Sequence, residues 1–305
     1  MKGSAGALIT AERSAFHRAL LSRGVLTVSS SSKSATGRIA SNGDVGQRMS
    51  ATLSCLLAER IAGGVGQELI CVEKKQDGQT LGNEFEAICE TFIRNCFSKM
   101  THLRPGTWVV EKVGGRSEDK VSKYAQYSHL SDLKRLADEH TTLATFLGNG
   151  YTVAPDVIIA RKPEPDEILN AQFPLVDERS ARMSALRESN SQRQEEILHA
   201  SISCKFTMRS DRAQNTRTEA LNLIRNRKGR SPHIVALTAE PTPSRIASLA
   251  LGTGDVDCVY HFALFELVET LRSNVDWDDA LDQLMVMIDG KRIRDISDLP
   301  LDLII

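Results

Sequence analysis

Three acids and one lysine on separate predicted elements are the residues of this sequence best suited to chemistry. Asp156 follows a proline before a β-branched run, Lys205 lies in a strand of small polar residues, and Glu219 and Glu86 fall on two helices. Carboxylates that converge on one point form a hard-oxygen site that suits a divalent cation such as Mg²⁺. A lysine beside such a cation can orient or help to deprotonate a water, while the metal lowers the pKa of that water and screens a phosphate's charge. The combination suits hydrolysis of a phosphodiester.

Each of these residues also has an ordinary structural explanation. A Pro-Asp pair before a strand is common, and most such aspartates are turn or cap residues. Lys205 taken alone would be an edge-strand or surface lysine, and Glu219 or Glu86 alone would be an ordinary helix-surface acid. The signal lies in the combination of Pro-Asp, then S-x-K on a strand, then an acid on the next helix.

The tetrapeptide RSDR, directly after the strand of Lys205, carries side chains that could read DNA bases. Arginine donates two parallel hydrogen bonds to guanine O6 and N7, and a carboxylate accepts a hydrogen bond from cytosine N4. Arg209, Asp211 and Arg212 at a helix N-terminus could therefore read adjacent G·C and C·G pairs in a major groove. The alternative is a local Arg–Asp salt bridge, with Asp211 capping the helix. A neighbouring phosphodiesterase-like metal site favours the reading role.

The overall charge excludes a protein that coats nucleic acid through net positive charge. The 305 residues include 38 basic and 39 acidic side chains. Between Arg209 and Arg230, however, seven basic residues stand against two acidic ones. This cluster could face phosphates or could be a solvated helix face.

Cysteine usage and hydropathy predict a cytoplasmic protein without a membrane segment. The six cysteines form no CxxC pair, which is typical of reduced thiols in a cytosolic protein. Glu12 and Arg13 stand where a signal peptide would be apolar. No run approaches the roughly 20 apolar residues that a membrane span needs.

The hydrophobic pattern predicts an α/β fold, with a central mixed β-sheet flanked by helices. We expect helices over 9–22, 44–61, 80–99, 131–147, 210–228 and 276–288, and strands over 151–161, 198–208, 233–240 and 255–265. Asp44 is a candidate N-cap and the glycine pair at 63–64 a stop signal for the second helix. The strand over 198–208 alternates between apolar and polar residues, so we expect it to be half-buried. Gln79 and Glu86 should share one flank of the third helix.

Two segments do not fit this pattern of packed elements. A serine-rich stretch at about 24–43 is expected to be a flexible loop or arm that becomes ordered only on a partner. A polar stretch at about 162–197 is broken by prolines and then helical, which indicates an insertion between two strands.

Several stretches resemble one enzyme family, the type II restriction endonucleases with the PD-(D/E)xK nuclease core, and within it the group that cuts sites containing CCGG. The resemblance is strongest in SCKFTMRSDRAQNTRTEALNLIRNRKGR and GTGDVDCVYHFALFEL, and more diffuse in GQTLGNEFE and APDVIIAR. It implies a single endonuclease domain over 1–305 with a restriction-endonuclease-like core. It also implies Mg²⁺-dependent hydrolysis of double-stranded DNA that leaves 5′-phosphate ends. The most similar member of the group recognises GCCGGC.

The resemblance also implies catalytic roles. Asp156 would be the shared metal ligand, and Lys205 would position the attacking water. Ser203 occupies the place where commoner nucleases of this core have an acid, and Glu219 would supply that acid from the following helix. The implied ligands of two Mg²⁺ ions per active site are Asp156, Glu86, Glu219 and the backbone carbonyl of Cys204.

DNA contacts and partners follow from the same resemblance. The implied contacts are Arg209, Asp211 and Arg212 with the central CCGG, Gln79 with the minor groove, and Arg245 and Asp44 with the outer base pair. Enzymes of this group act as homotetramers, as dimers of dimers, and a cognate DNA methyltransferase is expected in the host without forming a stable complex.

Two other functions remain compatible with the residues. One is a repair or recombination nuclease of the same fold that reads DNA structure; RSDR argues against it, since such enzymes need phosphate contacts more than base readers. The other is a non-catalytic DNA-binding protein, against which the intact Asp156, Lys205 and Glu219 argue.

Overall fold

The computed structural model describes residues 6–73, 76–113, 121–140, 142, 145, 155–190, 195–252 and 254–305. The chain divides into two compact units. The first unit comprises Met1–Lys99, Ser203–Arg217 and Val235–Ile305, and the second comprises Met100–Ile202 and Thr218–Ile234. A single endonuclease domain stays a prediction.

Six strands are hydrogen-bonded in the order β3-β4-β5-β6-β7-β8. Their bounds are Trp108–Lys112 for β3, Val157–Arg161 for β4, Ile197–Lys205 for β5, His233–Thr238 for β6, Cys258–His261 for β7 and Ile293–Asp295 for β8. The pairs β3–β4 and β4–β5 are antiparallel, whereas β6–β7 and β7–β8 are parallel. The sheet is therefore mixed and has helices beside it, which confirms the predicted fold class.

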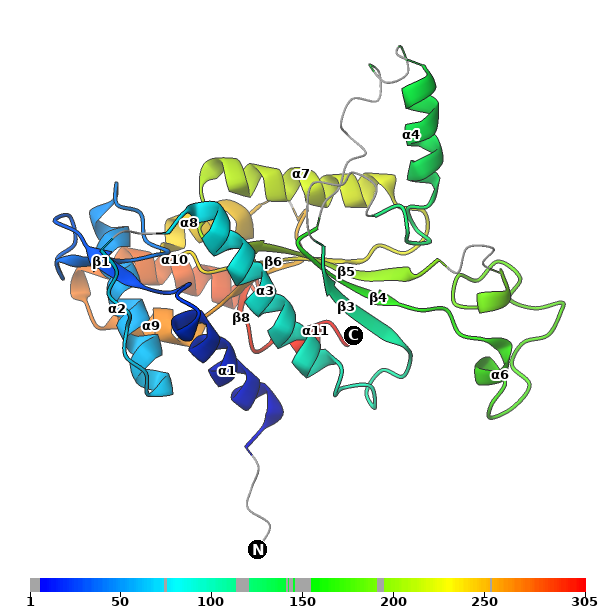
Figure 1. Ribbon diagram of the computed structural model, residues 1–305, viewed down its shortest axis with the longest axis horizontal. Helices are drawn as coiled ribbons and strands as arrows, with labels where there is room; N and C mark the ends of the chain where they lie inside the picture. The colour runs from blue at the N-terminus through cyan, green and yellow to red at the C-terminus, as the bar shows by residue number, and fades with distance from the viewer. Residues whose placement is uncertain are drawn as a thin grey trace, which may run out of the picture. The chain divides into compact units, whose positions relative to one another are not determined.

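Most helices belong to the first unit. They are α1 (Leu8–Ser22), α2 (Arg48–Val65), α3 (Gly78–Phe97), α8 (Pro243–Ala250), α9 (Leu264–Arg272), η2 (Val275–Trp277), α10 (Asp278–Asp289) and α11 (Leu299–Asp302). The second unit holds α4 (His129–Glu139), α6 (Asp166–Leu169) and η1 (Glu188–Asn190). Helix α7 (Ser210–Asn226) begins in the first unit and ends in the second. Helices α1 and α3 pack side by side, as do α2 and α9 (Figure 1).

Strand β5 is buried on both faces, so the expectation of a half-buried strand is wrong. Phe206, just beyond the strand, contacts Phe85 of α3, with 5.4 Å between ring centroids. On the opposite face, the Ser203 hydroxyl lies 3.4 Å from that of Thr216 in α7. The alternation predicted correctly which residues share a face. It could not show that a helix also covers the polar face.

The serine-rich segment at 24–43 forms a β-hairpin, contrary to the predicted loop. Strands β1 (Val28–Ser30) and β2 (Arg38–Ala40) pair antiparallel, and Leu26 and Ile39 are buried. The amide of Asn42 donates to the carbonyl of Ala239 at 2.7 Å, which ties the end of the hairpin to the chain after β6. Few apolar residues make this packing possible, and they are scattered among serines, so the composition of the segment did not indicate a packed hairpin.

Two further local predictions are corrected by the structure. Helix α2 begins at Arg48 rather than at residue 44, and it runs through the glycine pair to Gly66, whose left-handed conformation (φ 66°) ends it. In the described part of the insertion, only the four-residue α6 and the three-residue η1 are helical. The side chain of Arg187 holds this segment instead, because it donates to Asp166 and to the carbonyls of Asp177 and Ser180.

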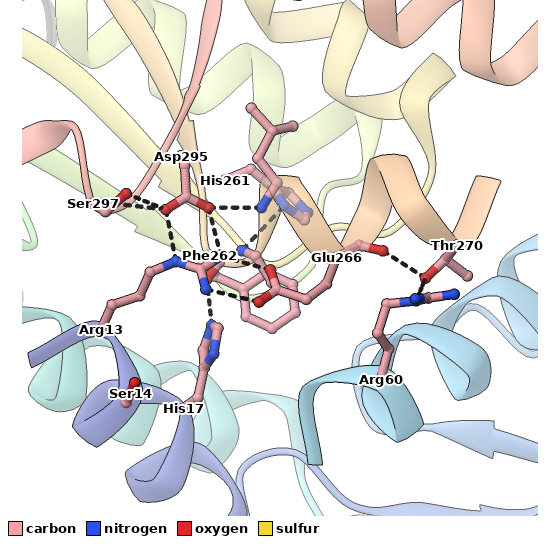
Figure 2. A network of polar contacts seen from close by, with 12 residues as sticks. Arg13, Ser14, His17, Arg60, His261, Phe262, Glu266, Thr270, Asp295 and Ser297 are labelled. Atoms are coloured by element: carbon pink, nitrogen blue, oxygen red, sulfur yellow. Dashed lines mark hydrogen bonds and ion pairs between the residues drawn. The ribbon is translucent and has the colours of Figure 1, made fainter. Parts of the chain in front are cut away.

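A partly buried ion cluster joins α1 to the C-terminal part of the first unit (Figure 2). The Arg13 guanidinium donates to both oxygens of Asp295 at 2.8 Å and to both of Glu266, at 2.7 and 2.5 Å. Burial opposes ionisation of Asp295, but the hydrogen bonds from Arg13 outweigh it and lower the pKa of Asp295 below its ordinary value. The cluster is therefore ionised at neutral pH, and each charge depends on the others.

Among the helices that the structure describes, none combines the length and the apolar content that crossing a bilayer requires.

Replacing Arg13 by Met should lower the free energy of unfolding by about 3–5 kcal/mol, because the fully buried Asp295 and the half-buried Glu266 would lose their counterion. Urea unfolding of both proteins measures the change. Arg23→Met is the matched control, since Arg23 pairs with Glu84 at the surface and its loss should cost below about 1 kcal/mol. Equal effects of the two substitutions would contradict a stabilising role for the cluster.

The stability of the protein should fall on mild acidification because of His261. This ring is fully buried; its Nδ1 accepts a hydrogen bond from the Ala263 N–H at 3.2 Å, and its Nε2 faces the Glu240 carbonyl at 3.1 Å. Burial lowers the pKa of His261 to about 4. At a pH above the ordinary pKa of histidine, the ring is neutral in both the folded and the unfolded protein, so the full stability is present there. As the pH falls below that value, the unfolded chain binds a proton that the folded protein does not. Stability is therefore lost until the pH reaches the pKa of the folded protein.

We expect His261 to cost about 2 kcal/mol of unfolding free energy between about pH 7.5 and about pH 5. Urea unfolding at both pH values measures this loss. In His261→Gln the pH dependence should be smaller, although not zero, since burial also lowers the pKa of His17. An undiminished pH dependence in this variant would contradict the assignment.

Candidate functional site

The second unit holds two of the predicted catalytic acids. Asp156 directly precedes β4, and its carbonyl accepts a hydrogen bond from Val113 N–H at 2.9 Å. Glu219 lies in α7 and is half-buried, as Asp156 is. Asp156 therefore lies where the chain enters the sheet, and the hydrogen bond from Val113, a residue distant in sequence, fixes its backbone.

The first unit holds Lys205, the last residue of β5. Its carbonyl oxygen accepts two hydrogen bonds from the end of the neighbouring strand, from the Thr238 hydroxyl at 2.9 Å and from Ala239 N–H at 3.2 Å. These bonds fix the backbone at the point where the chain leaves the sheet. Ser203, two residues before Lys205, faces Thr216 as described above. Cys204, which lies between Ser203 and Lys205, is buried.

Helix α3 of the first unit carries Gln79 and Glu86. Asp77 caps this helix, because its carboxylate accepts from the N–H groups of Gln79 at 2.9 Å and Thr80 at 3.2 Å. Gln79 is exposed in the first turn, and Glu86 is half-buried two turns later. The seven-residue spacing gives them one flank of the helix, as predicted.

The predicted metal ligands are all oxygen donors, which is the donor chemistry that Mg²⁺ prefers. They are divided between the two units, and within the described residues no three His, Cys, Asp or Glu side chains are gathered closely enough to hold a metal ion. The metal site therefore stays a prediction, with a donor set that fits it.

The base-reading residues, by contrast, come together within the first unit. A hollow of about 320 Å³ lies among the β1–β2 hairpin, the start of α3, the turn after β5 and α8, and we call it the reader hollow. Four of the six predicted DNA contacts line it, namely Asp44, Arg209, Arg212 and Arg245. Asp211 and Gln79 do not line it; both are exposed in the first turns of their helices. Three arginines make this hollow attractive to the acceptor atoms and phosphates of DNA.

Arg245 and Asp44 form an ion pair in the reader hollow, although 201 residues separate them. The hydrogen bond from Arg245 is the main cause that lowers the pKa of Asp44, followed by the bond that its carboxylate accepts from Gly46 N–H at 2.7 Å. Asp44 was also predicted to cap α2, and this is wrong. Its side chain lines the reader hollow instead.

The RSDR turn does not contain the local salt bridge that was the alternative explanation. Arg212 donates to the Thr207 hydroxyl at 2.6 Å and to the Thr207 carbonyl at 3.2 Å. In the part of the chain that the structure describes, the Arg209 guanidinium and the Asp211 carboxylate have neither a hydrogen bond nor an ion pair. Both polar groups are available to a ligand.

Sequence reasoning missed three residues of this region. Thr207 holds Arg212, and Gln76, which lies just before α3 and three residues before the predicted Gln79, lines the hollow. Glu240 is fully buried and does not line the hollow, and its carboxylate accepts from Met208 N–H at 2.9 Å and Thr242 N–H at 3.2 Å. Burial raises the pKa of Glu240, an effect that the Met208 hydrogen bond and the charge of Arg245 oppose. The sequence signal was an acid at the end of the apolar strand HIVALTAE.

Comparisons with known proteins agree with the resemblance. The NgoMIV restriction enzyme family matches residues 16–305. The chain is 49% identical over 296 residues to the type II restriction enzyme NgoMIV of Neisseria gonorrhoeae, which covers 97% of this chain and 98% of that one.

Two solved structures show weaker likenesses. One is Bse634I restriction endonuclease, at 12% identity and a TM-score of 0.36, covering 77% of this chain and 82% of that one. The other is a complex of restriction endonuclease PspGI with substrate DNA, at 13% identity and a TM-score of 0.26, covering 86% and 96%. These TM-scores are too low to support a conclusion.

An identity of 49% over nearly the full length of both chains leaves no doubt about descent. The chain belongs to the NgoMIV restriction enzyme family, and it is a type II restriction endonuclease, an enzyme that cleaves DNA at a specific site.

Proposed function

We propose that this enzyme recognises GCCGGC in double-stranded DNA and hydrolyses it with Mg²⁺, leaving 5′-phosphate and 3′-hydroxyl ends. The observation that carries the proposal is the reader hollow, which gathers three arginines and one aspartate from separate parts of the first unit. Arginine and aspartate side chains match the acceptors of guanine and the N4 donor of cytosine in the major groove.

The readers divide into an inner and an outer set. Arg209, Asp211 and Arg212 lie on one turn and are assigned to the central CCGG. Arg245 and Asp44 are assigned to the outer G·C pair, since one donates to guanine and the other accepts from cytosine. Gln79 is assigned to the minor groove. Their positions in the first unit support this division.

The chemistry is assigned to Lys205 and the acids. Asp156, Glu86, Glu219 and the carbonyl of Cys204 would hold Mg²⁺, with two ions per active site. Bound metal would lower the pKa of a water and screen the charge of the phosphate. The Lys205 ammonium orients the attacking water by donating a hydrogen bond to it, and its positive charge offsets the charge that develops on the phosphate. Ser203 is neutral and faces Thr216, so Glu219 takes the role of the second acid.

The assembly and location follow the family. We assign a homotetramer, a dimer of dimers that binds two DNA sites, acting in the cytoplasm. A methyltransferase in the same host would have to protect the recognition sites from cleavage.

Asp156→Ala and Lys205→Ala should each reduce cleavage of a GCCGGC plasmid in Mg²⁺ by a factor of about 10³ or more, because each removes a group that acts in the transition state. Specific binding in Ca²⁺, measured by gel shift, should persist. Lys99→Ala is the matched control, since the exposed Lys99 lies 3.9 Å from Glu12, outside the reader hollow. Cleavage by Lys205→Ala at the wild-type rate would show that the catalytic assignment is wrong.

Asp211→Ala should relax discrimination at one base pair of CCGG by about 1–3 kcal/mol, the usual value of a base contact. Sequencing the ends of fragments cut from a mixed-site library measures the preference. Asp279→Ala is the matched control, because Asp279 is also an exposed acid in the first turn of a helix, α10. An unchanged preference in Asp211→Ala would instead favour a nuclease that reads DNA structure.

A further inference from the structure

Glu240 has no role in the proposed function, yet this buried acid contacts Met208, beside the inner readers, and Arg245, an outer reader. Its side chain is fully buried at the end of β6, and each carboxylate oxygen accepts a backbone N–H. A fully buried polar group that loses a hydrogen bond keeps its desolvation cost. Such a group holds its donors in a narrow range of positions.

The first donor, Met208 N–H, belongs to the turn that carries the inner readers. Met208 immediately precedes Arg209, and its amide lies 2.9 Å from Glu240 Oε2. The turn is also held by the hydrogen bonds that Arg212 donates to Thr207, and Arg245 Nη1 donates to the Met208 carbonyl at 3.5 Å. Glu240 holds the Met208 amide, and so it helps to fix where the inner readers leave the sheet.

The second connection leads to the outer readers. The same oxygen, Glu240 Oε2, lies 3.8 Å from Arg245 Nη1, and its partner Oε1 accepts from Thr242 N–H at the start of α8, the helix that carries Arg245. Arg245 in turn holds Asp44. One carboxylate thus contacts an outer reader, Arg245, and the residue that directly precedes the inner readers, Met208.

The third connection leads to the chemistry. The backbone N–H of Glu240 donates to the Thr238 hydroxyl at 3.1 Å, and that hydroxyl donates to the Lys205 carbonyl at 2.9 Å. The strand end that carries Lys205 and the turn that carries the inner readers are therefore joined through Glu240 as well as through the chain.

We propose that Glu240 is a positioning residue that sets the spacing between the inner readers, the outer readers and Lys205, and so determines site specificity without touching DNA. This inference rests on the proposed function. It predicts that disturbing Glu240 weakens discrimination at the inner and outer base pairs together, whereas loss of a single reader affects one pair.

The test compares cleavage by wild type and Glu240→Gln of GCCGGC, of ACCGGT, which differs at the outer pair, and of GCATGC, which differs at the innermost pair. The amide keeps the shape of the side chain but places an N–H₂ against one backbone N–H. For Glu240→Gln we expect the ratio of kcat/KM for GCCGGC over each altered site to fall by about tenfold, the discrimination that one base pair commonly supplies. Both ratios should fall in the same variant.

Asp295→Asn is the matched control. Asp295 is also a fully buried acid of the first unit, and it accepts the Leu264 N–H at 2.9 Å and pairs with an arginine, but its bonds lead to Arg13 and the core. This variant should lose thermal stability and keep both ratios within about twofold of wild type. Loss of discrimination in Asp295→Asn as well would overturn the proposal, since general destabilisation would then explain both.

Thr238→Val provides a second test, which holds even where Glu240→Gln does not fold. It removes the hydroxyl between Glu240 and Lys205 with little change of shape. We expect kcat on GCCGGC to fall by about tenfold or more at an unchanged KM, because a small displacement of a catalytic group lowers the rate. A wild-type kcat in Thr238→Val, or wild-type ratios in a folded Glu240→Gln, overturns the inference. Failure of the wild-type enzyme to cut GCCGGC would overturn the proposed function instead, so the two failures are distinguishable.

Discussion

The carbonyl oxygen of Lys205 accepts two hydrogen bonds from the end of β6, and the local architecture of the first unit depends on this contact. The chain must leave a strand that is buried on both faces and enter a helix within five residues. A free turn of that length could take several directions. The two bonds hold the end of the strand, and the hydrogen bond from Met208 to the buried Glu240 holds the turn. Arg209 and Arg212 then line the reader hollow, and Arg212 also stabilises the turn by donating to the hydroxyl and the carbonyl of Thr207.

Charged groups in the interior of the first unit limit the ways in which its elements can pack. A buried ion pair stabilises little by itself, because desolvation offsets much of the attraction, but a broken one is costly. Its main effect is to exclude arrangements in which a charge would be left unpaired. The Arg13 cluster does this for α1, α9 and β8, and Glu240 does it for the turn after β5 and for α8. The binding and chemical residues therefore stand on a framework with few alternative packings.

Local patterns predicted most of the elements, since helix α3, helix α7 and the alternation along β5 follow from periodicity within short windows. Local rules failed where distant residues compete for a side chain. Asp44 has the composition of an N-cap, but Arg245, distant in sequence, takes its carboxylate. The hairpin at 24–43 forms because its few apolar residues meet the rest of the first unit, which a local window cannot contain. Glu240 was overlooked for the same reason, because the turn that it holds through Met208 lies 32 residues earlier in the chain.

The ion pair between Asp44 and Arg245 also has a consequence for recognition. Under the proposed function both side chains must exchange this internal partner for the outer base pair. A correct G·C pair offers acceptors to the arginine and a donor to the carboxylate, so both regain their hydrogen bonds. A wrong pair satisfies at most one of them, and it must compete with an ion pair that is already formed in the free protein. Opening the internal pair costs the same free energy at every site, so it lowers absolute affinity for correct and incorrect sites alike. Discrimination at the outer position therefore comes from the wrong pair's failure to replace both hydrogen bonds, which leaves one group without its partner.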